Sequence, residues 1–123
     1  MIDFEWEPEP IEAAELEEIV RRLAEERPDF VYTMGDSFMG CQYTHADGEP
    51  GCIIGQALYE AGRAIPYEHE ANTATDAQDL CEIHGLITGD YHWLWSVQKQ
   101  QDADVPWAAA VAYADEKRAA END

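Results

Sequence analysis

The chain has 123 residues, a length typical of a single domain, and apolar residues make up 46% of it, enough for a hydrophobic core. Acidic residues outnumber Lys and Arg by 27 to 7, which gives a formal net charge of −20. A chain with so few cations is not expected to bind nucleic acid or an anionic membrane surface directly. No apolar run approaches the ~20 residues of a membrane-spanning helix.

The cellular location can also be inferred from the ends and the cysteines. The first ten residues are acidic and rich in proline, unlike the basic start of a secretory signal. The three cysteines are an odd number, which favours a reducing compartment over a disulfide framework. The sequence therefore predicts a cytoplasmic protein.

The first third of the chain begins with an acidic arm, predicted to be extended, over residues 1–9. A helix is then predicted from Pro10 to about Glu26, where Pro28 ends it. Its apolar stripe comprises Ala13, Leu16, Ile19, Val20 and Leu23. Glu17 with Arg21, and Glu18 with Arg22, have the spacing of favourable ion pairs along a helix.

A short antiparallel hairpin is predicted next, because residues 30–34 and 38–44 are rich in β-forming side chains around a Gly-Asp-Ser turn. The Gly/Pro turn of residues 47–51 then leads into a second helix, predicted over residues 52–61. Gly55 within that helix indicates close approach of another element.

Three more helices are predicted in the last third. One opens with the capping-box spacing of Thr75 and Gln78 and reaches about His84, a second follows Asp90, and a third follows Asp104. Residues 115–123 are expected to fray. The predicted fold is α+β and mainly α: about five helices with one small antiparallel β-hairpin, in a single globular domain over residues 10–114.

A Gly-Asp-Ser block lies in the predicted hairpin and ends at Ser37. It resembles the block that opens the SGNH/GDSL hydrolases, in which the serine is the nucleophile. Such an enzyme also needs an Asp/His pair near the C-terminus, and Asp90-Tyr91-His92 does not have the required spacing. Gly-Asp-Ser is also ordinary turn chemistry, so a non-enzymatic role is favoured.

A metal site is the second chemical candidate. Cys41, Cys52, Cys81 and His84 supply four soft ligands, the number and kind that structural zinc takes. The first two cysteines are too far apart in sequence for the usual zinc knuckle. The alternative, which we favour, is that the cysteines are small buried apolar residues, so that no cofactor is expected.

Candidate partner-binding residues come from two helices. Trp93 falls off the predicted apolar stripe of its helix, so an exposed interface anchor is one interpretation, and a core or dimer contact is the other. Glu12, Glu15 and Glu18 supply negative charge along the first helix. The oligomeric state is left open.

Two patterns resemble those of small uncharacterised proteins of actinobacteria and their bacteriophages. One is Cys41-x-Tyr43 followed by Gly48-x-Pro50-x-Cys52-Ile53-Ile54-Gly55-x-x-Leu58 and Gly62. The other is Trp93-Leu94-x-x-Val97-Gln98-x-x-Gln101-Asp102 followed by Pro106-Trp107-x-x-Ala110-Val111. The resemblance implies a small accessory protein, expressed during phage infection, and brings no assigned activity.

Charge and resemblance together predict a non-enzymatic, acidic protein-binding module. Its partner would be a basic host protein, which it would inhibit by mimicking nucleic acid. Four alternatives stay open: acidity that serves only solubility or salt tolerance, a small zinc-stabilised domain, the hydrolase, and an oligomerising structural protein.

Overall fold

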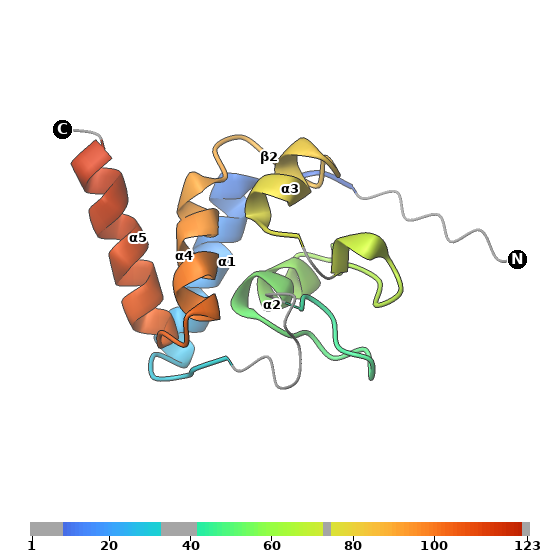
Figure 1. Cartoon of the computed structure of the whole chain (residues 1–123), viewed down its shortest axis with the longest axis horizontal. Helices are drawn as coiled ribbons and strands as arrows, with labels where there is room; N and C mark the ends of the chain where they lie inside the picture. The colour runs from blue at the N-terminus through green and yellow to red at the C-terminus, as the bar shows by residue number, and fades with distance from the viewer. Residues whose placement is uncertain (1–8, 33–41, 73–74, 122–123) are drawn as a thin grey trace, which may run out of the picture.

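The protein is described by a computed structural model over residues 9–32, 42–72 and 75–121 (Figure 1). It is mainly helical, as predicted. Five α-helices follow one another within these residues: α1 (Ala13–Glu26), α2 (Ile53–Glu60), α3 (Ala77–Glu82), α4 (His92–Asp102) and α5 (Trp107–Glu121). A 3₁₀ turn, η1, covers Glu70–Asn72. Helix α4 contacts all four other α-helices and so occupies the centre of the fold. Within the described part of the chain, no helix is long and apolar enough to cross a membrane.

The small sheet is not the predicted antiparallel hairpin. Strand β1 (Ile11–Glu12) pairs in parallel with β2 (Ile87–Thr88), with Ile11 opposite Ile87. The hairpin prediction is wrong where it can be compared, because residues 30–32 form no strand and Thr44 makes only an isolated bridge with Pro50. The Phe30 carbonyl instead accepts a hydrogen bond from the Trp107 amide at the start of α5. The turn and most of the second predicted strand lie outside the described residues.

Helix α1 buries the stripe that its sequence predicts, with Leu16 and Val20 fully covered. It begins at Ala13 rather than at Pro10, because the preceding two residues belong to β1. Glu17 pairs with Arg21 at 2.8 Å as expected. Arg22 does not pair with Glu18, and its guanidinium contacts Glu60 of α2 at 2.7 Å and Glu26 at 3.3 Å.

Two buried glutamines of α4 hold the starts of neighbouring helices. The Gln101 Oε1 atom accepts hydrogen bonds from the Ile53 amide of α2 at 2.7 Å and from the Trp107 indole at 3.2 Å. Residue Cys52, at the N-cap of α2, contributes no side-chain cap. The side-chain carbonyl of Gln101, from another helix, therefore accepts the hydrogen bond of a backbone amide that a local capping residue would ordinarily satisfy.

Gln98 acts in the same way one turn earlier. Its Oε1 atom accepts from the Ala77 amide of α3 at 2.8 Å, and its Nε2 atom donates to the Tyr43 hydroxyl at 2.8 Å. That hydroxyl donates in turn to the Thr75 carbonyl at 2.9 Å, and burial raises the pKa of Tyr43 well above its ordinary value. We call Gln98, Gln101 and Tyr43 the amide core. The capping box that opens α3 is formed by Asp76 and Asp79, one residue later than predicted.

The close approach predicted at Gly55 is confirmed. A Cβ atom there would lie 2.3 Å from the Tyr43 carbonyl oxygen, so any side chain would push this loop off α2. The buried amide of Asn72 fixes the same loop, because its Oδ1 accepts from the Thr44 amide at 2.7 Å and its Nδ2 donates to the Thr44 carbonyl at 2.8 Å.

The predicted domain limits change at the C-terminal end. Helix α5 continues to Glu121, so the prediction that residues 115–123 fray is wrong as far as the structure describes them. Asp115 and Arg118, within that stretch, both bond to α1. Of the predicted N-terminal arm, only Glu9 is described. Helix α5 leans away from α4 towards its C-terminus (Figure 1), and the space between them is filled by the residues described next.

Candidate functional site

Trp93 fills the space where α1, α4 and α5 diverge. Its side chain is buried, and its indole Nε1 donates to the Asp115 carboxylate at 2.8 Å. The guanidinium carbon of Arg21 lies 4.7 Å from the ring centroid and that of Arg118 lies 5.7 Å from it. The interpretation of Trp93 as an exposed anchor is therefore wrong, and the alternative of a core contact describes it correctly.

Four charged residues surround this indole: Glu17 and Arg21 from α1, and Asp115 and Arg118 from α5. We call them the ion cluster. Arg21 contacts Asp115 at 2.6 Å, and Arg118 contacts Glu17 at 2.9 Å. The Arg21 hydrogen bond lowers the pKa of Asp115, and the Arg118 hydrogen bond lowers the pKa of Glu17. Two cations and two carboxylates thus neutralise each other across the helix pair.

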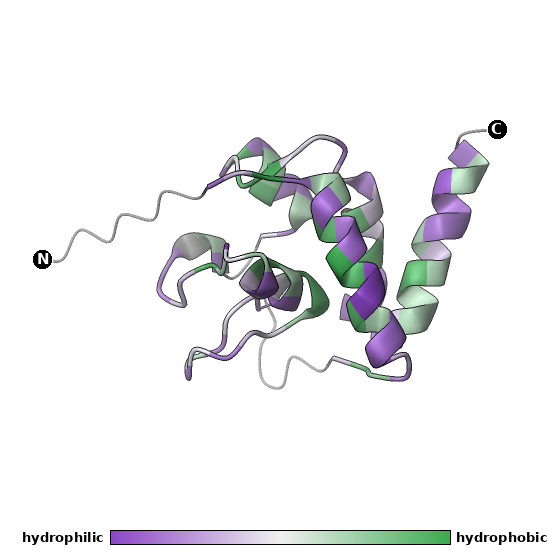
Figure 2. Cartoon of the chain, turned by 180° about the vertical axis from the view of Figure 1, so that it is seen from behind, coloured by the Kyte–Doolittle hydropathy of each residue, from purple (hydrophilic) through white to green (hydrophobic). Residues whose placement is uncertain are grey.

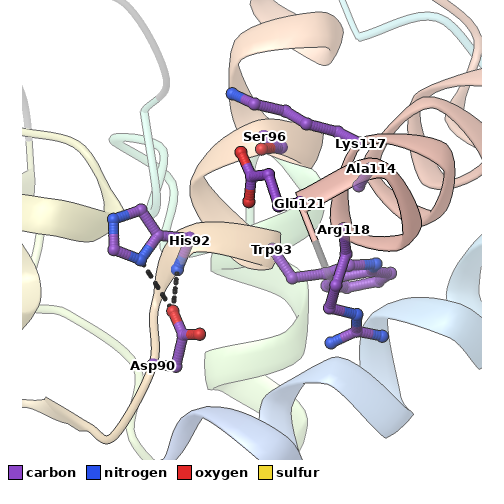
Figure 3. A pocket seen from close by; sticks show the side chains of 8 residues that line it. All are labelled: Asp90, His92, Trp93, Ser96, Ala114, Lys117, Arg118 and Glu121. Carbon is purple, nitrogen blue, oxygen red and sulfur yellow. Dashed lines mark hydrogen bonds and ion pairs between the residues drawn. The ribbon is translucent and has the colours of Figure 1, made fainter. Parts of the chain in front are cut away.

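Two small cavities adjoin the ion cluster, with volumes of about 110 and 330 Å³. Asp90, Trp93 and Arg118 line both of them. The smaller cavity also takes in His92 and Ser96 of α4 and Lys117 of α5 (Figure 3). Asp90, Glu121, Lys117 and Arg118 line the smaller cavity, and Glu12, Glu17, Asp90 and Arg118 line the larger one, so neither presents a net positive site for an anionic ligand.

Asp90, His92 and Ser96 are the residue types of a hydrolytic relay, but they do not form one. The Asp90 carboxylate accepts from the His92 amide at 2.9 Å and contacts His92 Nδ1 at 2.7 Å, and these bonds lower the pKa of Asp90. The imidazole stacks on Tyr91 at 4.5 Å and points away from the Ser96 hydroxyl (Figure 3). A general base must reach the proton it removes, and His92 does not reach Ser96 here. Ser37, the nucleophile of the Gly-Asp-Ser hypothesis, lies outside the described residues.

The zinc hypothesis can be compared with the structure at three of its four residues. Cys52 is fully buried and disulfide-bonded, so it offers no free thiolate, and the prediction of an unpaired cysteine is wrong there. Its disulfide also removes the support that cysteine usage lent to a reducing compartment. Cys81 is free and half-buried, and His84 lies beyond the end of α3, with its ring 5.7 Å from that of His69. Cys41 is outside the described residues. Among the residues described, no three His, Cys, Asp or Glu side chains are grouped to hold a metal ion.

The three predicted partner-binding acids are all exposed. Glu12 lies in β1, and Glu15 and Glu18 lie on the outer face of α1. Glu25, two turns beyond Glu18, continues the same face and is also exposed. We call Glu15, Glu18 and Glu25 the acidic stripe.

All seven Lys and Arg residues are in contact with a carboxylate or an aromatic ring. Arg21, Arg22, Arg63 and Arg118 contact carboxylates. The guanidinium of Arg27 lies 3.9 Å from the Phe30 ring centroid, and Lys99 and Lys117 lie 4.6 and 5.4 Å from that of Trp95. Each Lys and Arg side chain thus has such a contact, while the acidic stripe faces solvent.

No family model, curated protein or solved structure matches this chain. Some residues of the two patterns quoted from the sequence have a structural role in the fold. Gly55 allows the loop at Tyr43 to approach α2, and Gln98, Gln101 and Trp107 form or contact the amide core.

Sequence reasoning missed the residues that organise the interior. Gln98 and Gln101 are polar and were not assigned to the core, although they lie one turn apart beside the buried Leu94 and Val97. The sequence predicts fraying at Asp115 and Arg118, which the structure places in α5. In both cases a signal existed: polar residues with helical spacing, on the same face as apolar ones.

Proposed function

We propose that this protein is a non-enzymatic binding module that presents an acidic surface to a basic partner protein. Binding would be driven by the attraction between exposed carboxylates and clustered Lys and Arg of the partner. Such attraction raises the association rate and discriminates against acidic competitors.

One observation carries the proposal: the basic residues are engaged within the molecule, while the acidic stripe is not. The Lys and Arg side chains are the groups that could offset the carboxylates, and four of the seven contact carboxylates already. Glu15, Glu18 and Glu25 are exposed on one face of α1. Part of the uncompensated charge thus lies on one face of a helix, where it can act as a surface.

The sharper form of the proposal is nucleic-acid mimicry. Carboxylates spaced by one or two helical turns form a row of negative charge on a rigid support, which is how a duplex presents its phosphates. The resemblance to phage proteins favours a basic, nucleic-acid-binding host protein as the target. Location in the host cytoplasm belongs to the same proposal.

The test is displacement of DNA. A basic DNA-binding protein loaded with fluorescent duplex is titrated with this protein, and release of the DNA is followed by anisotropy at several salt concentrations. We expect release that becomes weaker as salt rises, because the competing interaction is between charges.

A matched pair of variants separates a defined surface from bulk charge. The triple variant Glu15→Gln, Glu18→Gln, Glu25→Gln removes the acidic stripe, and Asp47→Asn, Glu49→Gln, Glu68→Gln removes three exposed acids elsewhere. The first triple should weaken displacement about tenfold or more and the second only slightly. Equal losses, or no displacement by the parent protein, would overturn the proposal.

A further inference from the structure

A shallow groove runs between the C-terminal half of α1 and the first half of α5. It is lined by Arg21, Ala24, Glu25, Pro28, Ala108 and Val111 and has a volume of about 270 Å³. Ala24 is buried, Val111 is half-buried, and Pro28 and Ala108 are exposed. The first half of α5, which forms one wall of the groove, is more apolar than the second half (Figure 2).

The groove is held in shape by the backbone. The Trp107 amide donates to the Phe30 carbonyl and the Ala108 amide to the Pro28 carbonyl, each at 3.0 Å. These are the first amides of α5, which have no partner within the helix. Because they bond to the segment that follows α1, the two walls are fixed relative to each other before any partner binds.

The rim of the groove is negative. Glu25 lines it and is exposed, and Glu18 lies two turns earlier on the same face of α1. The cation in the lining, Arg21, already contacts Glu17 at 2.8 Å and Asp115 at 2.6 Å.

We propose that this groove binds a basic amphipathic helix of the partner protein. An apolar side chain of that helix would pack over Ala24, Ala108 and Val111, and a flanking Lys or Arg would reach Glu25. This is the way in which amphipathic helices dock in apolar grooves elsewhere. The inference rests on the proposed function and adds to it the place of binding and the form of the partner.

The negative charge of the protein favours a basic helix in the groove over a second copy of the chain. Two copies would bring together surfaces that each carry a formal charge of −20, and the Lys and Arg residues that could bridge them are already in internal contacts. A basic helix gains from the same charges, because it meets Glu25 in the lining and Glu18 on the same face of α1.

The experiment uses the full chain and a fluorescent amphipathic helical peptide made only of Leu and Lys, with binding followed by anisotropy. We expect saturable one-to-one binding that weakens with salt, and no binding of the peptide in which Glu replaces every Lys. Binding of the Glu peptide with equal affinity would overturn the inference.

Two variants probe the groove itself, each with a matched control. Ala108→Leu fills the groove without changing charge and should weaken peptide binding about tenfold, while Ala109→Leu, at the exposed neighbour outside the lining, should leave it unchanged. Glu25→Gln should weaken binding about two- to fivefold, with Glu49→Gln as its control. Circular dichroism and thermal melts confirm that each variant is folded.

The outcomes separate this inference from the proposed function. If Ala108→Leu and Ala109→Leu bind the peptide equally, the groove is not the docking site, whereas DNA displacement through the acidic stripe is unaffected by that result. If the peptide does not bind the parent protein at any salt concentration, the inference is overturned in the same way.

Discussion

The amide core and the ion cluster solve the same problem, the joining of helices, with opposite chemistry. In the amide core, neutral glutamines of α4 bond to the backbones of α2 and α3, and Gln98 and Gln101 are fully buried. In the ion cluster, charged side chains join α1 to α5, and the Arg21 and Asp115 side chains remain 35% and 40% exposed.

This difference has an energetic consequence. A buried donor or acceptor without a partner has lost its hydrogen bonds to water and gained none within the protein. Breaking the amide core should therefore lower the free energy of unfolding strongly. Partly exposed ion pairs are screened by water and salt and contribute little individually. The amide core therefore specifies the fold, whereas the ion cluster chiefly occupies cations that would otherwise reduce the negative surface. Four predictions test this contrast, in order of expected effect.

The largest effect is expected for Gln101→Leu. The change leaves the Ile53 amide and the Trp107 indole without their shared acceptor in the interior, and we expect it to lower the free energy of unfolding by about 2–5 kcal/mol. Urea denaturation measures the change. Gln100→Leu, at a half-buried neighbour, is the control, and an equal loss in both variants would remove the special role of the amide core.

Tyr43→Phe should have the next largest effect. It deletes the hydroxyl that joins the Gln98 side chain to the Thr75 carbonyl and leaves both groups unpaired, at an expected loss of about 1–3 kcal/mol. Tyr113→Phe, at an exposed tyrosine of α5, should change the free energy of unfolding by less than about 0.5 kcal/mol. The loss at Tyr43 should be the same at low and high salt, since no charge is removed.

Asp115→Asn tests the ion cluster, and we expect a loss of about 1 kcal/mol or less that shrinks as salt is added. Because the folded state lowers the pKa of Asp115, its contribution is present above the ordinary value of 3.8 and is lost as pH falls through the folded value. Parent and variant should therefore converge in strongly acidic solution. A difference that persists there, or that is insensitive to salt, would contradict the electrostatic account.

The smallest effect, of opposite sign, is expected for Asp102→Asn beside the amide core. Burial raises the pKa of Asp102, so its ionised form opposes folding at neutral pH, and stability rises as pH falls through the folded value. The variant should be slightly more stable than the parent at neutral pH and should lose this advantage below the ordinary pKa of 3.8. Thermal melts across this range measure it, and a destabilised variant at neutral pH would contradict the account. The bond that its side chain accepts from Gln101 Nε2 at 3.2 Å can be kept by asparagine.

The helices were predictable from sequence because their signals are local. The stripe of α1 and the glycine of α2 each follow from residues within a few positions. Gln101 was not predictable as a cap for α2. The backbone amide that it accepts from belongs to Ile53, 48 positions away, and nothing in either local sequence indicates the other. The parallel pairing of β1 with β2 was not predictable either, because strands of two residues are too short to show an alternating pattern.

The candidate site was predictable only in its charge. Glu15 and Glu18 could be placed on an exposed face by the period of α1, and the structure places them there. The burial of Trp93 depends on contacts with Asp115 and Arg118 of α5, in the stretch that the sequence predicts to fray. Tertiary partners, rather than the helix itself, decide whether such a residue is inside or outside.

The parallel pairing of β1 and β2 has a consequence for how the protein is made. The Thr88 hydroxyl and the Ile11 carbonyl, joined in this pair, are separated by 77 positions in the chain. During synthesis, β1 cannot dock until the chain has been made as far as β2, and closing so long a loop slows folding. Until then β1 has no partner strand and α1 lacks its contacts with α4 and α5, so nascent chains stalled before β2 should depend on chaperones in a way that released chains do not.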